Sequence, residues 1–235
     1  MKKIILLFVL ILAASGALVA QTAGANTDAA SIGVDTAQQN LQEISISKFE
    51  DSGFWRVYMP IDQGVIQARR FEGGPAAKEP LEEEEALGIA TPDEHVLGVK
   101  ASFFRRGNSE IYIQPLRPLQ VPGVTKTISV WVVGRNFNHT LYAIVGDYFG
   151  NVNTLNMGTL NHSGWRELTV AVPPSLRQMD QNYNDRMGLQ ILGFMIVPAL
   201  LETYGTYYVY FDGLTVLTDL FAEESRDTDD MVDSW

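Results

Sequence analysis

The sequence predicts an all-β fold, an antiparallel β-sandwich or jelly roll, and three features support this prediction. Short runs rich in β-branched and aromatic residues recur along the chain, as in residues 128–133, Ile-Ser-Val-Trp-Val-Val. These residue types suit a pleated, half-buried surface. Glycine, proline and asparagine separate the runs, and helical periodicity is almost absent between residues 44 and 220. Many short strands joined by such turns are typical of a sandwich or jelly roll.

The expected strands begin at Ile44 and end at Leu217. In the first of them, Ile44 and Ile46 alternate with serines, which is the period of a strand with one buried face. Turn residues such as Gly107-Asn108 and Gly150-Asn151 stand in the gaps. The later strands are expected at residues 55–59, 65–71, 96–104, 110–114, 126–133, 140–146, 155–160, 165–172, 189–197 and 207–217.

Residues 1–20 have the layout of a secretory signal peptide. Lys2 and Lys3 precede an apolar stretch at residues 4–14, and small residues follow it. The apolar stretch is shorter than the roughly 20 residues that a membrane span needs. We therefore expect export, with cleavage at the end of this range or before Asn26. An uncleaved N-terminal anchor is the alternative.

Composition divides the rest of the chain into an arm, a domain and a tail. Residues 21–43 are rich in Ala, Thr, Gln, Asn and Asp and are expected to form a flexible N-terminal arm. Residues 44–220 form the expected jelly-roll domain. Within it, residues 72–94 form an acidic excursion that contains four consecutive glutamates at 82–85. The excursion is either a contact surface or a solvated charge run.

Acidic residues outnumber basic ones, and they dominate the tail at residues 221–235. The formal net charge is −11, and removal of Lys2 and Lys3 with the signal peptide lowers it to −13. Because an acidic surface repels phosphates and anionic headgroups, we expect no nucleic-acid partner and no membrane partner. We interpret the tail as mobile, with Trp235 as a docking residue.

Residues typical of catalysis are scarce. The chain has no cysteine, which excludes a thiol nucleophile, a disulfide framework and a lipoprotein anchor. Its three histidines, His95, His139 and His162, are far apart and match no metal-ligand spacing. No nucleophile elbow and no phosphate-binding glycine loop is present. A catalytic pair of Asp or Glu side chains, as in glycoside hydrolases, is not excluded by the sequence. We nevertheless expect that the protein is not an enzyme and has no catalytic residue and no obligate cofactor.

A series of motifs follows one order along the domain. They are Phe49-Glu50-Asp51, Trp55, Ile128-Ser129-Val130-Trp131, Asp147 with Gly150, Gly164-Trp165, and residues 208–216 at the close. This order is similar to that of carbohydrate-binding jelly rolls of the galactose-binding type. The first and last strands of such a fold are neighbours, so Glu50 and Asp212 are expected to converge.

The resemblance also implies a calcium candidate. In such modules, carboxylates equivalent to Glu50 and Asp212 often hold a structural calcium ion. Calcium takes six or more oxygen ligands, and only these two side chains can be identified as candidate ligands from the sequence. The alternative is that the two carboxylates face solvent or cap turns.

Aromatic residues allow two interpretations. They could stack on sugar rings, or they could fill the core, which is the more common fate of aromatic residues in alternating strands. We expect the core. The residues concerned are Trp55, Trp131, Trp165, Tyr204, Tyr207, Tyr208 and Tyr210.

The signal peptide and the cysteine-free body occur together with four motifs. These motifs are Phe49-Glu50-Asp51, the Trp131 strand, Trp165 and Phe211-Asp212-Gly213-Leu214. In this combination, the whole mature chain resembles the flagellar filament outer-layer (sheath) protein family of spirochaetes, FlaA.

The FlaA resemblance implies a structural subunit. Such a subunit coats a flagellin core in the periplasm, contributes to filament stiffness and shape in motility, and has no catalytic activity. Its implied partners are the flagellin core filament and other sheath subunits, with self-association. The alternative function is a periplasmic or secreted carbohydrate-binding module.

Overall fold

The computed structural model describes residues 40–81, 93–107, 109–179 and 188–220. These residues belong to one compact unit, Gly33–Trp235. Our expectations for the signal peptide, most of the arm, the glutamate run and the tail fall outside the described residues. Within the described part, the only helical elements are two short 3₁₀ turns, η3 (Ser52–Phe54) and η4 (Leu200–Glu202), so the all-β prediction is confirmed. No helix in that part is long and apolar enough to cross a membrane.

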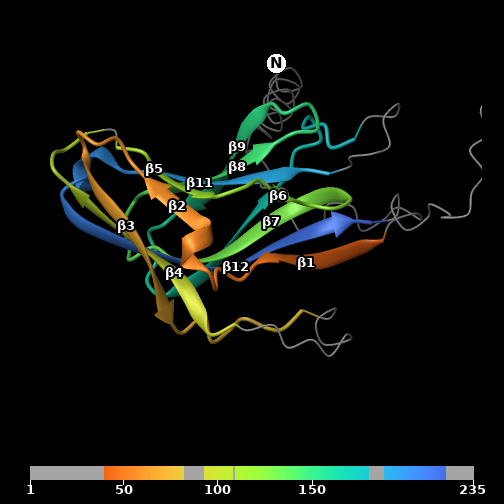
Figure 1. Ribbon diagram of the computed structural model, residues 1–235, viewed down its shortest axis with the longest axis horizontal. Coiled ribbons are helices and arrows are strands. Elements are labelled where there is room, and N and C mark those ends of the chain that lie inside the picture. The colour runs from red at the N-terminus through yellow and green to blue at the C-terminus, as the bar shows by residue number, and fades with distance from the viewer. Residues whose placement is uncertain (1–39, 82–92, 108, 180–187, 221–235) are drawn as a thin grey trace, which may run out of the picture. The chain divides into compact units, whose positions relative to one another are not determined.

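The strands form two antiparallel sheets (Figure 1). β1 pairs with β12 in the first sheet, and β6 pairs with β11 in the second. The first sheet has the order β10 (Trp165–Ala171), β7 (Val124–Val133), β12 (Gly205–Asp219), β4 (His95–Phe103) and β3 (Gly64–Glu72), with β1 (Leu41–Ser47) off this path. The second has the order β2 (Trp55–Tyr58), β5 (Ile111–Pro115), β11 (Gln190–Val197), β8 (Thr140–Gly146) and β9 (Val152–Thr159), with β6 (Leu119–Gln120) off this path.

The inner faces of the two sheets share one apolar core. Phe194 of β11 and Phe211 of β12 stack with their ring centroids 5.6 Å apart, so aromatic contacts join the sheets. Phe49 stacks on Trp55 at 4.5 Å. All four rings are buried. Burial of large apolar side chains is the main force that holds such a sandwich together.

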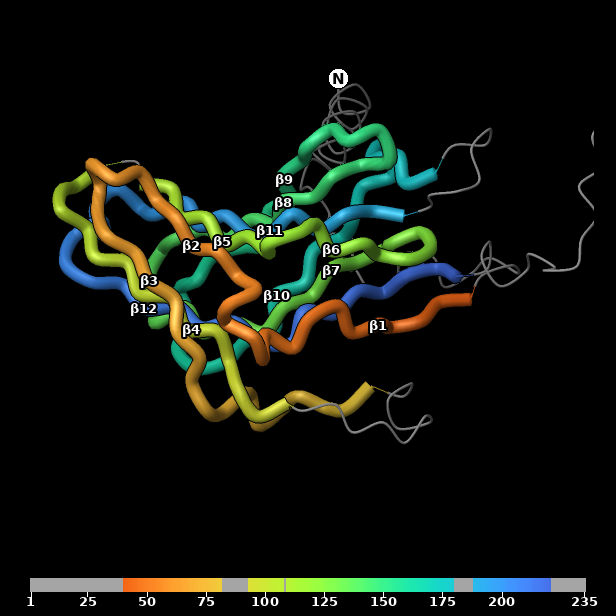
Figure 2. Tube along the Cα trace, viewed as in Figure 1, coloured from red at the N-terminus to blue at the C-terminus, as the bar shows by residue number. Residues whose placement is uncertain are grey.

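Strand β12 is the central strand of the first sheet. Its first half pairs with β4 and its second half with β1, while β7 lies along its other edge. Figures 1 and 2 show β1 beside the second half of β12. The predicted adjacency of the strands around Ile44 and Asp212 is therefore confirmed, with Ile44 opposite Val216.

Most strand limits differ from the prediction by one to three residues, and two differences are larger in consequence. β1 starts at Leu41, because Leu41 pairs with Asp219, so the strand takes in the last three residues of the expected arm, 21–43. The two-residue strand β6 was not predicted, since two residues are too few to show a period.

Candidate functional site

Asp212 lies at an irregularity in the middle of β12. The register of β12 against β7 shifts between Asp212 and Thr215, and Gly213 has a φ of +49°. Such bulges redirect side chains and often lie next to functional sites. The Asp212 side chain is 2% exposed, and its Oδ1 accepts a hydrogen bond from the Gly213 amide at 2.7 Å.

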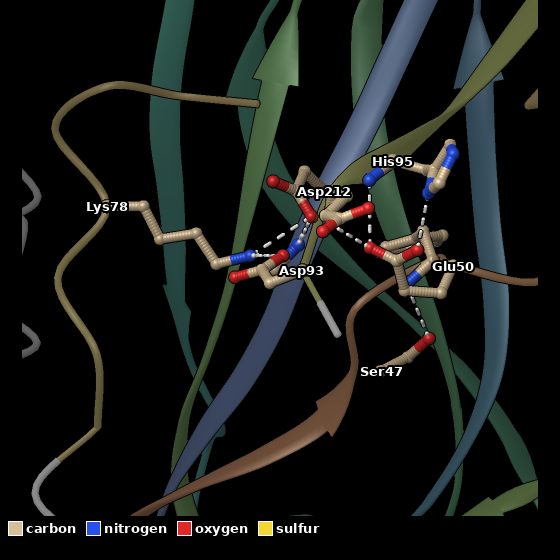
Figure 3. A network of polar contacts seen from close by, with 9 residues as sticks. Ser47, Glu50, Lys78, Asp93, His95 and Asp212 are labelled. Carbon is tan, nitrogen blue, oxygen red and sulfur yellow. Dashed lines mark hydrogen bonds and ion pairs between the residues drawn. The ribbon is translucent and has the colours of Figure 1, made fainter. Parts of the chain in front are cut away.

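Lys78 supplies the positive charge beside this buried carboxylate. Its ammonium lies 3.1 Å from Asp212 and 2.8 Å from Asp93 (Figure 3). Burial raises the pKa of Asp212, and the ammonium opposes that rise. Lys78 precedes the glutamate run and Asp93 follows it, so the two pairs tie both ends of the excursion to the first sheet.

Glu50 binds the start of β4. Its Oε1 accepts hydrogen bonds from the amides of Glu94, at 2.6 Å, and His95, at 2.8 Å. Its Oε2 lies 2.8 Å from Nδ1 of His95. Burial opposes ionisation of Glu50, but the hydrogen bonds from His95 and Glu94 outweigh it, so the pKa of Glu50 lies below its usual value.

An unusual backbone turn at Phe49 precedes Glu50. Phe49 has a φ of +57°, a left-handed conformation that is rare for a bulky residue. The burial of its ring and a hydrogen bond from its amide to Oγ of Ser47, at 3.2 Å, accompany this conformation. Such strain persists only where the surroundings determine it strongly.

The polar contacts of Glu50 and those of Asp212 form two sets that meet at the consecutive residues Asp93 and Glu94 (Figure 3). We call the two sets together the polar network, and its surroundings do not fit calcium. The oxygens of Glu50 bind Glu94 and His95, and those of Asp212 bind Gly213 and Lys78. Among the described residues, no group of three or more His, Asp or Glu side chains is arranged to hold a metal ion. The cation beside Asp212 is an ammonium.

The residues that complete this network were missed in the sequence. Lys78, Asp93 and His95 come from the excursion and from its junction with β4. A carboxylate that the fold buries needs a counter-charge, and this requirement was the one available signal. This requirement does not identify which basic residue supplies the counter-charge.

A groove of about 770 Å³ lies beside the network on the outer face of the first sheet. Its walls come from β1, β7, β10, β12 and the excursion. Half-buried Trp131 and the carboxylates of Glu43 and Glu167 line it, together with Lys78. The groove mixes an aromatic side chain with charges of both signs.

The other two histidines lie elsewhere. His139 is fully buried, and its Nδ1 accepts a hydrogen bond from the Ala199 amide at 3.2 Å. Burial lowers the pKa of His139 to about 4, although the charge of Glu202 acts in the opposite direction. His162 is half-buried, and its carbonyl accepts from the Asn136 amide. Their separate surroundings do not suggest a shared catalytic role.

The aromatic residues divide between the core and the surface. Trp55 and Tyr207 are in the core, as expected. The expectation was wrong for Tyr204 and Tyr208, which are exposed, and it holds only in part for the three that are half-buried. Those three are Trp131, Trp165 and Tyr210.

Two of the exposed aromatic rings border a hollow of about 350 Å³ on the outer face. Phe71 is 44% exposed and Tyr208 is 41% exposed. A Cβ at Gly98 would lie 2.5 Å from the Phe71 ring, so the absence of a side chain makes room for this ring. Lys100 lies over the Tyr208 ring, with its ammonium 5.7 Å from the centroid, and Arg69 lines the same hollow.

Comparison with known proteins decides the family. The family model described as "Flagellar filament outer layer protein Flaa" matches residues 18–226. The chain belongs to this family, FlaA. The predicted FlaA resemblance is thereby confirmed. A relative, the "Putative flagellar filament outer layer-like protein" of Brachyspira hyodysenteriae, is 35% identical over 190 residues, which cover 81% of this chain and 85% of the relative.

Solved structures with a similar fold include carbohydrate-binding modules. The family 11 module of the Clostridium thermocellum cellulase Lic26A-Cel5E is 10% identical, with a TM-score of 0.41, and the match covers 75% of this chain and 94% of the module. The module TmCBM61, solved with a galactotriose, is 12% identical with a TM-score of 0.41, covering 75% and 99% respectively. At these values the likeness concerns the fold alone.

Proposed function

We propose that this FlaA-family chain is a structural subunit of the outer layer, or sheath, of the periplasmic flagellar filament. It coats a flagellin core and contributes to the stiffness and shape of the filament. The observation that carries the proposal is the family match over residues 18–226. The signal-peptide layout of residues 1–20 supports a periplasmic location. The role needs neither a catalytic step nor a cofactor.

A coat subunit meets the flagellin core and other coat subunits, so it needs surfaces held in a fixed orientation. The polar network provides one such device. Lys78 pairs with Asp212 in the first sheet and with Asp93 near the other end of the acidic excursion, so one ammonium holds the two ends of the excursion together at the sheet. This anchoring favours the interpretation of residues 72–94 as a contact surface over that of a solvated charge run.

Co-sedimentation tests the proposal. Periplasmic flagella are purified, washed at increasing salt and analysed by mass spectrometry. The proposal predicts that this chain remains with the filaments in a constant ratio to flagellin. If the chain stays in the supernatant at physiological salt, the proposal fails.

One surface favours a second candidate function, the binding of a saccharide. The exposed rings of Phe71 and Tyr208 and the cations Arg69 and Lys100 border the hollow on the outer face. Sugar rings stack on exposed aromatic rings, and cations bind acidic sugars. Retention on a polysaccharide column is the test. Tyr208→Ala should abolish retention and Phe149→Ala should not, because Phe149 is an exposed ring that does not line this hollow.

A further inference from the structure

Three loops meet at one end of the first sheet. Phe103, near the end of β4, pairs with Gly64 of β3 on one side and with Gly205 of β12 on the other. The loops that adjoin these three residues are therefore neighbours. We call them the tip, which comprises residues 60–63, 104–107 and 199–204.

Hydrogen bonds hold the loops of the tip together. The Phe104 amide donates to the Gln63 carbonyl at 2.8 Å. The Gly107 amide donates to Oγ1 of Thr203 at 3.2 Å, and this hydroxyl donates to the Leu200 carbonyl at 2.9 Å. The tip therefore presents its side chains on a connected framework.

Large apolar side chains of the tip point into solvent. Ile61 is 91% exposed and Leu201 is 76% exposed. Exposed apolar groups that gather in one place, in contrast to single scattered ones, mark interaction sites. The exposed apolar residues of the tip are Ile61, Phe104, Leu200, Leu201 and Tyr204.

The tip has two arginines and two carboxylates, and one of the carboxylates, Glu202, is hydrogen-bonded to Asn138. The Arg106 guanidinium lies over the Tyr204 ring, 5.5 Å from its centroid. Arg105 pairs with Asp62, whereas Arg106 forms no ion pair with any described residue. The chemistry of the tip therefore suits a partner that is both apolar and acidic.

The last fifteen residues of the chain have this composition. Residues 221–235 contain six carboxylates and one arginine. Phe221 and Trp235 stand at the two ends of the segment, with Met231 and Val232 between them. The segment thus supplies negative charge for Arg106 and apolar side chains for the tip.

The length of β12 determines which copy of the chain the segment can reach. β12 begins at the tip, with Gly205, and its fifteen residues end at Asp219, roughly 50 Å away at about 3.4 Å per residue. Residues 221–235 span at most about 50 Å when fully extended. The segment would therefore reach its own tip only at full extension, with no length left to lie on it.

We propose that residues 221–235 of one copy bind the tip of the next copy, so that subunits associate head to tail. A head-to-tail contact of this kind generates open arrays, such as rows along a filament. The inference rests on the proposed coat function and adds to it the surface and the segment through which copies meet.

Sedimentation velocity of the purified mature chain over a range of concentrations tests the contact. The tip variant is Ile61→Ser, Phe104→Ser and Leu201→Ser together. The segment variant is Asp227→Asn, Asp229→Asn, Asp230→Asn and Trp235→Ser together. The control, Leu116→Ser, Phe149→Ser and Val152→Ser together, removes three equally apolar, exposed side chains outside the tip. Circular dichroism verifies that all four proteins fold.

The native chain and the control should form concentration-dependent oligomers, and each of the other variants should associate at least about tenfold more weakly, because few residues carry most interface energy. A mixture of the tip and segment variants should form dimers that do not grow, since one intact tip and one intact segment remain. This result excludes docking within one copy.

Any one of three results would overturn the inference: a native chain that stays monomeric, a tip or segment variant that associates like the native chain, or a mixture of the two variants that forms no dimer. Binding to vesicles of phosphatidylglycerol and phosphatidylethanolamine is measured in parallel. If the native chain is monomeric and binds these vesicles, and the tip variant does not bind them, the tip is a lipid-binding surface instead. These outcomes are independent of co-sedimentation with filaments, so the coat function and the contact fail separately.

Discussion

The ammonium of Lys78 lies 3.1 Å from the carboxylate of Asp212, whose side chain is 2% exposed. The lysine comes from the acidic excursion and the aspartate from the irregularity in the middle of β12. The pair therefore links the acidic excursion to the central strand of the first sheet.

Loss of Lys78 should strongly destabilise the fold. Lys78→Met leaves the Asp212 carboxylate buried without its counter-charge, and breaking a buried pair in this way costs about 3 kcal/mol or more. We expect the free energy of unfolding in urea at pH 7 to fall by about this amount. Lys78→Met with Asp212→Asn should recover a large part of the loss, because no buried charge remains.

Arg105→Gln is the matched control. Arg105 pairs with Asp62, and the side chains of both are 59% exposed. Exposed pairs contribute about 0–1 kcal/mol, so this variant should unfold almost like the native chain. Equal losses for Lys78→Met and Arg105→Gln would contradict the structural role of the Lys78–Asp212 pair.

Calcium should not change the stability of the protein. A ligand that binds only the folded state raises the melting temperature with its concentration. Because Glu50 and Asp212 bind protein donors and Lys78 supplies the cation, we expect the same melting curve in EDTA and in millimolar calcium chloride. A melting temperature that rises steadily with calcium would show that a calcium site exists.

Acid should destabilise the fold through His139. Burial lowers its pKa from 6.5 to about 4. Between these values the unfolded chain binds a proton that the folded chain does not, so stability is complete above pH 6.5 and falls as the pH decreases. The loss is about 1.4 kcal/mol per pH unit, or about 3 kcal/mol by pH 4. Urea unfolding at intervals between pH 7 and pH 4 measures it.

His139→Asn separates this effect from other titrations. Asparagine retains an acceptor for the Ala199 amide but loses the ring packing against Phe137 and Tyr207. The variant should be less stable at pH 7 and should depend less on pH between 6.5 and 4. If it keeps the full pH dependence of the native chain, another group is responsible.

The strands and the adjacency of the first and last ones were predictable from the sequence. Period-two patterns, such as Ile44 and Ile46 alternating with serines, report which face of a strand is buried. The expected proximity of Glu50 and Asp212 came instead from the resemblance of the motif order to a jelly roll whose first and last strands are neighbours.

The remainder depended on tertiary structure. Trp55 and Tyr208 both lie in strands, yet Trp55 is buried in the core and Tyr208 lies on the outer face. The face that a residue occupies depends on the register of the whole sheet, which bulges such as that after Asp212 shift. Lys78 was not predicted because it comes from an irregular segment without a period. The tip was missed because its three loops are far apart in sequence.

Electron microscopy of a strain that lacks this gene tests the central claim most directly. The proposed coat function implies that the flagellin core assembles without this chain, so filaments should still be present. They should be thinner and altered in curvature, because material far from the filament axis contributes most to bending stiffness. Filaments of unchanged diameter and shape in the deletion strain would contradict the assignment of this chain to the outer layer.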